Sequence, residues 1–70
     1  MVKLFVSYTY IELRKTGEYR GFGNTEVRCD SMPESIEDVN LIERGILNDI
    51  ERSGVTDRVV NVRVLYWKAL

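Results

Sequence analysis

The chain has no histidine and one cysteine, Cys29, among its 70 residues. A structural zinc site needs four nitrogen or sulfur ligands, and a disulfide needs a second thiol, so neither can form within the chain. A nucleophilic cysteine also needs a base or another device that lowers its pKa. We therefore expect no metal, no cofactor and no catalytic residue, and we predict that Cys29 is a thiol of the core.

An excess of charge of one sign and long apolar runs are missing as well. Ten basic residues face eleven acidic ones, so no strong net field attracts nucleic acid or an anionic membrane. No stretch approaches the roughly twenty apolar residues of a membrane span, and the first residues contain no apolar signal region. We expect a cytoplasmic protein without a membrane partner, and nucleic acid is not the partner that this composition favours.

The chain is short for a stable core. Its 70 residues predict a single domain over positions 1–70. Domains of this size commonly gain stability from disulfides, metals or self-association. Because the first two are excluded, the length predicts a homo-oligomer, with a dimer as the first expectation.

What the chain does contain is a long β-hairpin. Residues 2–14 and 18–29 are extended runs on either side of Thr16 and Gly17, and glycine supplies the positive φ that a two-residue turn needs. With Thr16 and Gly17 as the turn, Lys15 faces Glu18 and the ring of Tyr10 covers Gly23. The even positions of the first run form an apolar face with a period of two: Val2, Leu4, Val6, Tyr8 and Tyr10.

One helix and one further strand follow the hairpin. Ser35 is the expected N-cap of a helix over residues 35–53, and Gly54 has the place of a C′ glycine. Residues 59–68 form the third strand, whose even positions are apolar and suited to the helix. The predicted fold class is α+β: a β-β-α-β two-layer domain, with a three-stranded antiparallel sheet in the order 2-1-3 and the helix packed on one face.

The hairpin is longer than the helix that should cover it. About thirteen strand residues span roughly 44 Å, whereas about eighteen helical residues span roughly 27 Å. The tip of the hairpin should therefore project as an arm beyond the core. Apolar side chains on this arm and on the helix-free face predict a protein interface, formed by Phe5, Ile11, Leu13, Tyr19, Phe22, Leu65 and Trp67.

Two further features could carry chemistry. The segment Gly21-Phe22-Gly23-Asn24 has the composition of a phosphate-binding loop, but it lies inside a hairpin and not before a helix, so a bulge or close packing is expected. Glu43 falls within the apolar arc of the helix. It is either an acid–base group with a raised pKa or a carboxylate that reaches a Lys or Arg at the sheet edge, and we favour the second.

Two hairpin segments, VSYTY at residues 6–10 and GFGNTEV at residues 21–27, resemble small uncharacterised proteins of phages and prophages. The likeness covers the hairpin best and the helix only by its pattern. It implies no catalytic residues. It does imply a phage or prophage setting, in which very small proteins often bind and redirect host or defence components.

Three functions follow from these features. The first is a non-enzymatic module that binds a host protein through the hairpin arm and the open sheet face. The second is an oligomeric protein that sequesters a nucleotide-like ligand near Tyr10, Phe22 and Asn24. The third is a single-stranded nucleic-acid binder, because aromatic and cationic side chains on an open sheet can stack bases.

Overall fold

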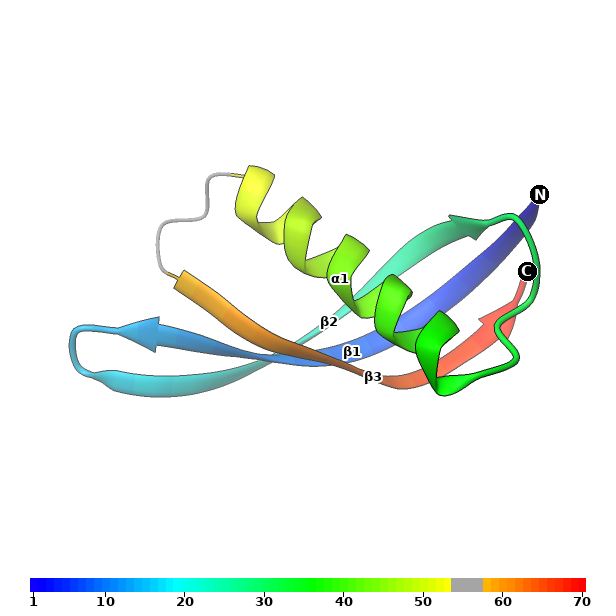
Figure 1. The fold of residues 1–70 in the computed structure, drawn as a ribbon. Coiled ribbons are helices and arrows are strands. Elements are labelled where there is room, and N and C mark those ends of the chain that lie inside the picture. The colour runs from blue at the N-terminus through cyan, green and yellow to red at the C-terminus, as the bar shows by residue number, and fades with distance from the viewer. Residues whose placement is uncertain (54–57) are drawn as a thin grey trace.

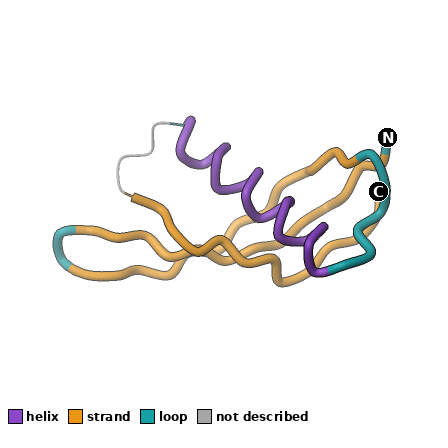
Figure 2. Tube along the Cα trace, viewed as in Figure 1, coloured by secondary structure: helices purple, strands orange, loops and turns teal. Residues whose placement is uncertain are grey.

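The computed structural model describes residues 1–53 and 58–70. Three strands and one helix follow in the order β1 (Val2–Arg14), β2 (Gly17–Cys29), α1 (Ile36–Arg52) and β3 (Arg58–Ala69) (Figure 1). Both strand pairs are antiparallel, and the sheet order is β2-β1-β3. The helix crosses one face of the sheet and leaves the other uncovered (Figure 2). The predicted α+β architecture and strand order are confirmed.

The tip of the hairpin projects beyond the helix. The domain measures 40 × 20 × 18 Å along its principal axes, and the long axis follows the hairpin, whose tip extends past the end of α1 (Figure 1). A helix of 17 residues covers only about 26 Å. The arm that the strand lengths predict is therefore present.

The turn of the hairpin differs from the expected one. Arg14 pairs with Gly17, so the two-residue loop is Lys15 and Thr16 and not Thr16 and Gly17. Gly17 has a φ of 137°, which L side chains rarely adopt. The whole register is shifted by two residues from the predicted one, and a shift of two leaves every side chain on its predicted face.

Two tyrosine–glycine pairs accompany this register. Tyr8 lies opposite Gly23, and Tyr10 lies opposite Gly21. A Cβ added at Gly23 would come within 2.6 Å of the Tyr8 Cζ, and a Cβ at Gly21 would also overlap the Tyr10 ring. The predicted register covered one glycine with one ring, whereas the observed register covers both. The hairpin ladder is continuous at these glycines, so their role is close packing and not a bulge.

The helix begins where the sequence predicts. The Ser35 hydroxyl accepts a hydrogen bond from the Asp38 backbone N–H at 3.2 Å, and the Asp38 carboxylate accepts one from the Glu34 N–H at 3.0 Å. The first bond satisfies an N–H that the first helical turn leaves without an intrahelical partner, and the second ties the residue before the N-cap to that turn. The N–H of Glu34 is also the main cause that lowers the pKa of Asp38. At the other end Ser53 is the C-cap, and the predicted C′ residue Gly54 lies outside the described residues.

The core lies between the helix and the strands β1 and β3. The helix packs mainly against β3. The side chains of Leu4 and Val6 are fully buried. The buried apolar cluster contains Leu4, Val6, Ile42, Ile46, Val59 and Val62.

The alternation of β3 is broken at two points. Its pairing with β1 shifts register between Thr9 and Ile11 and again between Ser7 and Tyr8. Asn61, at the first shift, has a φ of 55°, a conformation that asparagine tolerates better than most residues. Each shift adds one residue to β3 and reverses which face the following side chains occupy. The prediction that even-numbered residues of β3 face the helix is therefore correct only between the two shifts, at Val62 and Val64.

Candidate protein-interaction surface

The uncovered sheet face is built from the odd positions of β1 and the residues that pair with them. Leu4 and Val6 are buried toward the helix, so the alternating side chains of Phe5, Ile11 and Leu13 extend from the opposite face. These three are half-buried although no helix covers them. Ile11 has Val60 of β3 as its pairing partner, so the aliphatic side chains cover one another across the strands. Most of the predicted interface residues do share one face.

Phe22 is an exposed aromatic residue of this face, near the midpoint of the outer strand β2. It pairs with Thr9 and keeps 69% of its surface exposed. Thr9, beside it on β1, is buried, and the Thr9 hydroxyl donates to the Gly21 carbonyl at 2.8 Å. The buried hydroxyl on this face therefore has its hydrogen-bond partner, and most of the neighbouring Phe22 side chain is exposed.

Asn24 lies next to Phe22 along β2. Its side-chain oxygen accepts a hydrogen bond from the Ser7 hydroxyl at 2.8 Å. Tyr10, the third member of the predicted ligand site, packs against the core on the helix side of the sheet. Within one chain the structure therefore separates Tyr10 from Phe22 and Asn24 by the thickness of the sheet.

Tyr19 lies at the tip of the arm, on the helix side of the sheet, where it pairs with Glu12. Its hydroxyl is 2.8 Å from the Thr16 hydroxyl, and the Arg14 guanidinium lies 4.5 Å from its ring centroid. These contacts hold the ring in place, yet 43% of its surface stays exposed.

Two predicted residues of β3 lie elsewhere than expected. Trp67 pairs with Val6 and packs against the core, so its predicted position on the open face is wrong. Leu65 is the residue inserted at the second register shift and is exposed. The residue that does join the open face is Tyr66, which pairs with Ser7. A regular alternation along β3 predicts Tyr66 on the helix side, because it does not include the register shift between Ser7 and Tyr8.

Basic residues outnumber acidic ones on the open face, although the two kinds are nearly equal in number over the whole chain. Strand pairing brings Lys3, Arg20, Arg28, Arg58 and Lys68 to this face, together with Glu18 and Glu26. Lys3 and Glu26 form an exposed ion pair at 3.9 Å. Arg63, on the outer strand, approaches Glu43 of the helix at 4.0 Å. The acidic residues are concentrated elsewhere, so the sheet face carries a cationic excess around its apolar centre.

Glu43 has a structural partner at the sheet edge. Its Oε2 accepts the backbone N–H of Val64 at 2.8 Å, and its Oε1 is 4.0 Å from the Arg63 guanidinium. The interpretation as a carboxylate that reaches the sheet edge thus accounts for the misfit in the apolar arc, with a backbone N–H as its closer partner.

Cys29 packs against the core and is half-buried. Burial raises its thiol pKa, and the nearby charges of Asp30 and Asp38 raise it further. This environment is the reverse of the one that activates a nucleophilic thiol. Across residues 1–53 and 58–70, no cluster of three or more His, Cys, Asp or Glu side chains could hold a metal ion.

The helix of the described chain is not long and apolar enough to cross a membrane. No family model, no curated protein and no solved structure matches the sequence or its fold.

Proposed function

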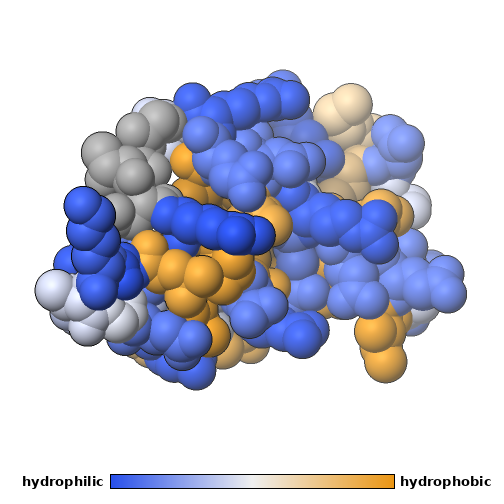
Figure 3. Space-filling model, turned by 60° about the vertical axis from the view of Figure 1, so that its left-hand side comes forward, coloured by the Kyte–Doolittle hydropathy of each residue, from blue (hydrophilic) through white to orange (hydrophobic). Residues whose placement is uncertain are grey.

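We propose that this protein is a non-catalytic interaction module that binds another protein through the uncovered sheet face and the hairpin arm. The observation that carries the proposal is Phe22, an aromatic ring that is 69% exposed on the outer strand of a sheet face whose central strand contributes half-buried apolar side chains. Aromatic anchors with an apolar surround are typical of the residues that dominate protein interfaces. Figure 3 views the molecule from the arm end, where some apolar side chains reach the surface between hydrophilic ones; strand pairing, and not this view, identifies the residues of the sheet face.

The charge of the face indicates the chemistry of the partner. Exposed Arg20, Arg28 and Lys68 surround the apolar centre, so an acidic surface with an apolar pocket would complement it. The resemblance to phage and prophage proteins supports a host or defence protein as the partner, and the host cytoplasm as the compartment.

The test is capture of a partner with an immobilised chain, in wild-type form and as Leu13→Ser/Phe22→Ser. Loss of two buried apolar contacts should weaken binding by about 3 kcal/mol together, which is roughly a hundredfold. Met32→Ser/Ile36→Ser is the matched control, because these residues are also exposed and apolar but lie outside the sheet. Circular dichroism must show an intact fold for both variants. Equal binding by both double variants would refute the proposal.

A single-stranded nucleic acid is the second candidate, and the cationic excess on the aromatic face is the observation that favours it. Phe22 and Tyr66 are exposed on this face, where bases could stack. Its signature would be affinity for an oligonucleotide that falls steeply with salt. A partner protein bound through apolar contacts would show a much weaker dependence on salt.

A further inference from the structure

The outer edge of β2 presents a regular row of backbone groups. β2 is an outer strand, and its pairing with β1 runs without interruption from Gly17 to Cys29. The Gly21 carbonyl accepts the Thr9 hydroxyl of β1, so Gly21 directs its carbonyl toward β1. In an antiparallel ladder, alternate residues direct their N–H and C=O groups to opposite sides. The even-numbered residues from Glu18 to Arg28 therefore direct theirs outward, as a template for another strand.

The opposite edge of the sheet, formed by β3, is less suited to this pairing. Its ladder with β1 contains two register shifts, and irregularities of this kind twist an edge away from flat pairing. The Val64 N–H on this strand is already bonded to the Glu43 carboxylate. Of the two edges, β2 is the one that another strand can join over its full length.

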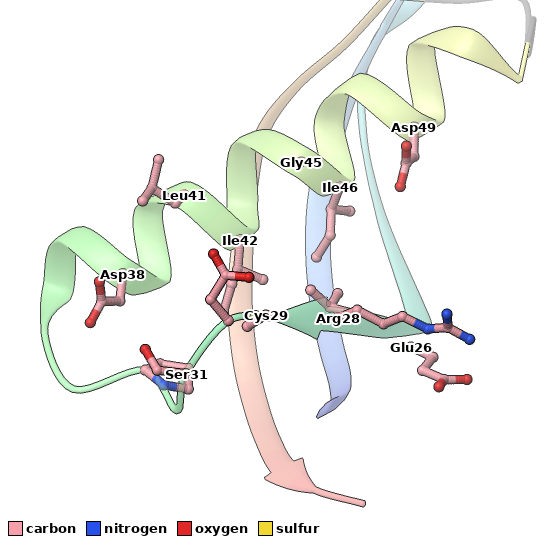
Figure 4. Close-up of a pocket in the computed structure, with 13 residues that line it drawn as sticks. Glu26, Arg28, Cys29, Ser31, Asp38, Leu41, Ile42, Gly45, Ile46 and Asp49 are labelled. Atoms are coloured by element: carbon pink, nitrogen blue, oxygen red, sulfur yellow. The ribbon is translucent and has the colours of Figure 1, made fainter. Parts of the chain in front are cut away.

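A groove lies beside β2 on the helix side of the sheet. Because α1 packs mainly over β3, it leaves an open volume of about 510 Å³ next to the end of β2. Ile46 extends from the helix toward the strands, and Cys29 lies below the helix (Figure 4). The groove combines an apolar floor with carboxylates, and its lining includes Val27, Cys29, Ile42, Asp30, Asp38 and Asp49.

The charged residues of β2 are spaced so that two antiparallel copies of this strand place opposite charges across from one another. Gly23 is the midpoint of the strand, and antiparallel pairing of two copies about this residue aligns both strands completely. Glu18 then faces Arg28 of the second copy, and Arg20 faces Glu26. Opposite charges directly across two strands stabilise a pair, whereas like charges destabilise it.

The same register matches the arm tip of one copy with the groove of the other. Tyr19, 43% exposed on the helix side, faces Val27 of the second copy, which lines the groove. The basic Lys15 at the tip approaches the end of the groove that contains Asp30 and Asp38. Backbone, charge and shape thus favour one alignment.

We propose that two copies of this chain pair β2 to β2, antiparallel about Gly23, to form a six-stranded sheet. Both helices then lie on one side, and the two uncovered sheet faces become one continuous surface. This dimer does not depend on the protein-binding function, because its backbone pairing uses the edge of β2 and its tip uses the groove, whereas the partner binds around Phe22; only the charged residues Glu18, Arg20, Glu26 and Arg28 lie on the face that both surfaces border.

Charge reversal at one pair tests both the dimer and its register, with sedimentation equilibrium as the measurement. Wild type should have the mass of two chains at tens of micromolar. Glu18→Arg and Arg28→Glu each place like charges opposite one another twice in the symmetric dimer, and each should weaken association about tenfold. The double variant Glu18→Arg/Arg28→Glu restores opposite pairs and should restore the wild-type affinity. Glu51→Arg, on the exposed end of the helix, should change nothing.

A wild-type chain that stays monomeric up to about millimolar concentration would overturn the proposal. So would an effect of Arg28→Glu without one of Glu18→Arg, since a register centred on Val27 pairs Glu26 with Arg28 and leaves Glu18 outside. Failure of the double variant to recover, with the fold intact by circular dichroism, would equally exclude this pairing. None of these results would affect partner capture through Phe22, so the two proposals fail separately.

Discussion

Replacing Glu43 with alanine should destabilise the protein more than any other single change on the helix surface. The Glu43 side chain is only 13% exposed, and it accepts the Val64 N–H at 2.8 Å. A hydrogen bond to a charged group contributes about 1.5–3 kcal/mol to stability. The approach to Arg63 adds little, because that guanidinium is 71% exposed. Water can reach the outer strand once the carboxylate is removed, so we expect the lower part of this range, about 1.5–2 kcal/mol.

Urea unfolding followed by circular dichroism measures this loss, at one fixed protein concentration because association would shift the midpoint. For a domain of this size the change corresponds to a fall in Tm of roughly 6–16 °C. Glu51→Ala is the matched control, because it makes the same chemical change at an exposed helical position. Alanine raises helix propensity equally in both variants, so this gain cancels when their free energies of unfolding are compared. Glu43→Gln keeps a carbonyl acceptor for Val64 and should lose less than half as much.

Two results would refute this account of Glu43. A loss for Glu43→Ala within about 0.5 kcal/mol of the Glu51→Ala value would mean that the hydrogen bond stabilises nothing. Equal losses for Glu43→Gln and Glu43→Ala would show that the side chain acts through its charge or its packing, and not as an acceptor for Val64.

Further expectations concern the core, the helix start and the thiol. Leu4→Ala should cost about 2–5 kcal/mol by urea unfolding, because the side chain is fully buried. Ser35→Ala should cost about 1 kcal/mol through loss of the cap bond to Asp38. The Asp38 pKa is lowered in the folded state, so ionised Asp38 stabilises the fold at pH values above its unfolded pKa. This stabilisation is lost as the pH falls through the lower, folded pKa. In Asp38→Asn the free energy of unfolding should therefore fall less steeply with decreasing pH in the acid range. Cys29 should react with a thiol reagent at neutral pH more slowly than free cysteine, because its pKa is raised, and fast labelling would contradict its placement.

The architecture followed from side-chain pattern because that pattern determines burial. The even positions of the first strand, among them Leu4 and Val6, are apolar throughout, and this strand is the most apolar of the three, which predicts its place at the centre of the sheet. The hairpin register was wrong by two residues. A shift of two changes no face, so burial could not distinguish the registers. The predicted register follows from Thr16 and Gly17 as the turn, which pairs Lys15 with Glu18, whereas the observed register covers both Gly21 and Gly23 with tyrosine rings.

The interface prediction failed where the backbone departs from a regular strand. A constant period along β3 predicts Trp67 on the open face, but two register shifts turn its side chain toward the core, opposite Val6. Asn61, whose residue type tolerates a positive φ, is the one local signal of the first shift. For Glu43, its position in the apolar arc predicted a partner at the sheet edge, but only the folded backbone identifies the Val64 N–H.

The most direct test of the uncovered sheet face as the binding surface is photo-crosslinking from single positions. A benzophenone side chain replaces Phe22 in one variant and Glu51 in another, and both are irradiated in host lysate and analysed by mass spectrometry. Both positions are exposed, but only position 22 lies on the sheet face. We predict a covalent adduct with a second, different protein from position 22 and none from position 51. An adduct from position 51 alone, or no adduct with another protein from position 22, would contradict the central claim.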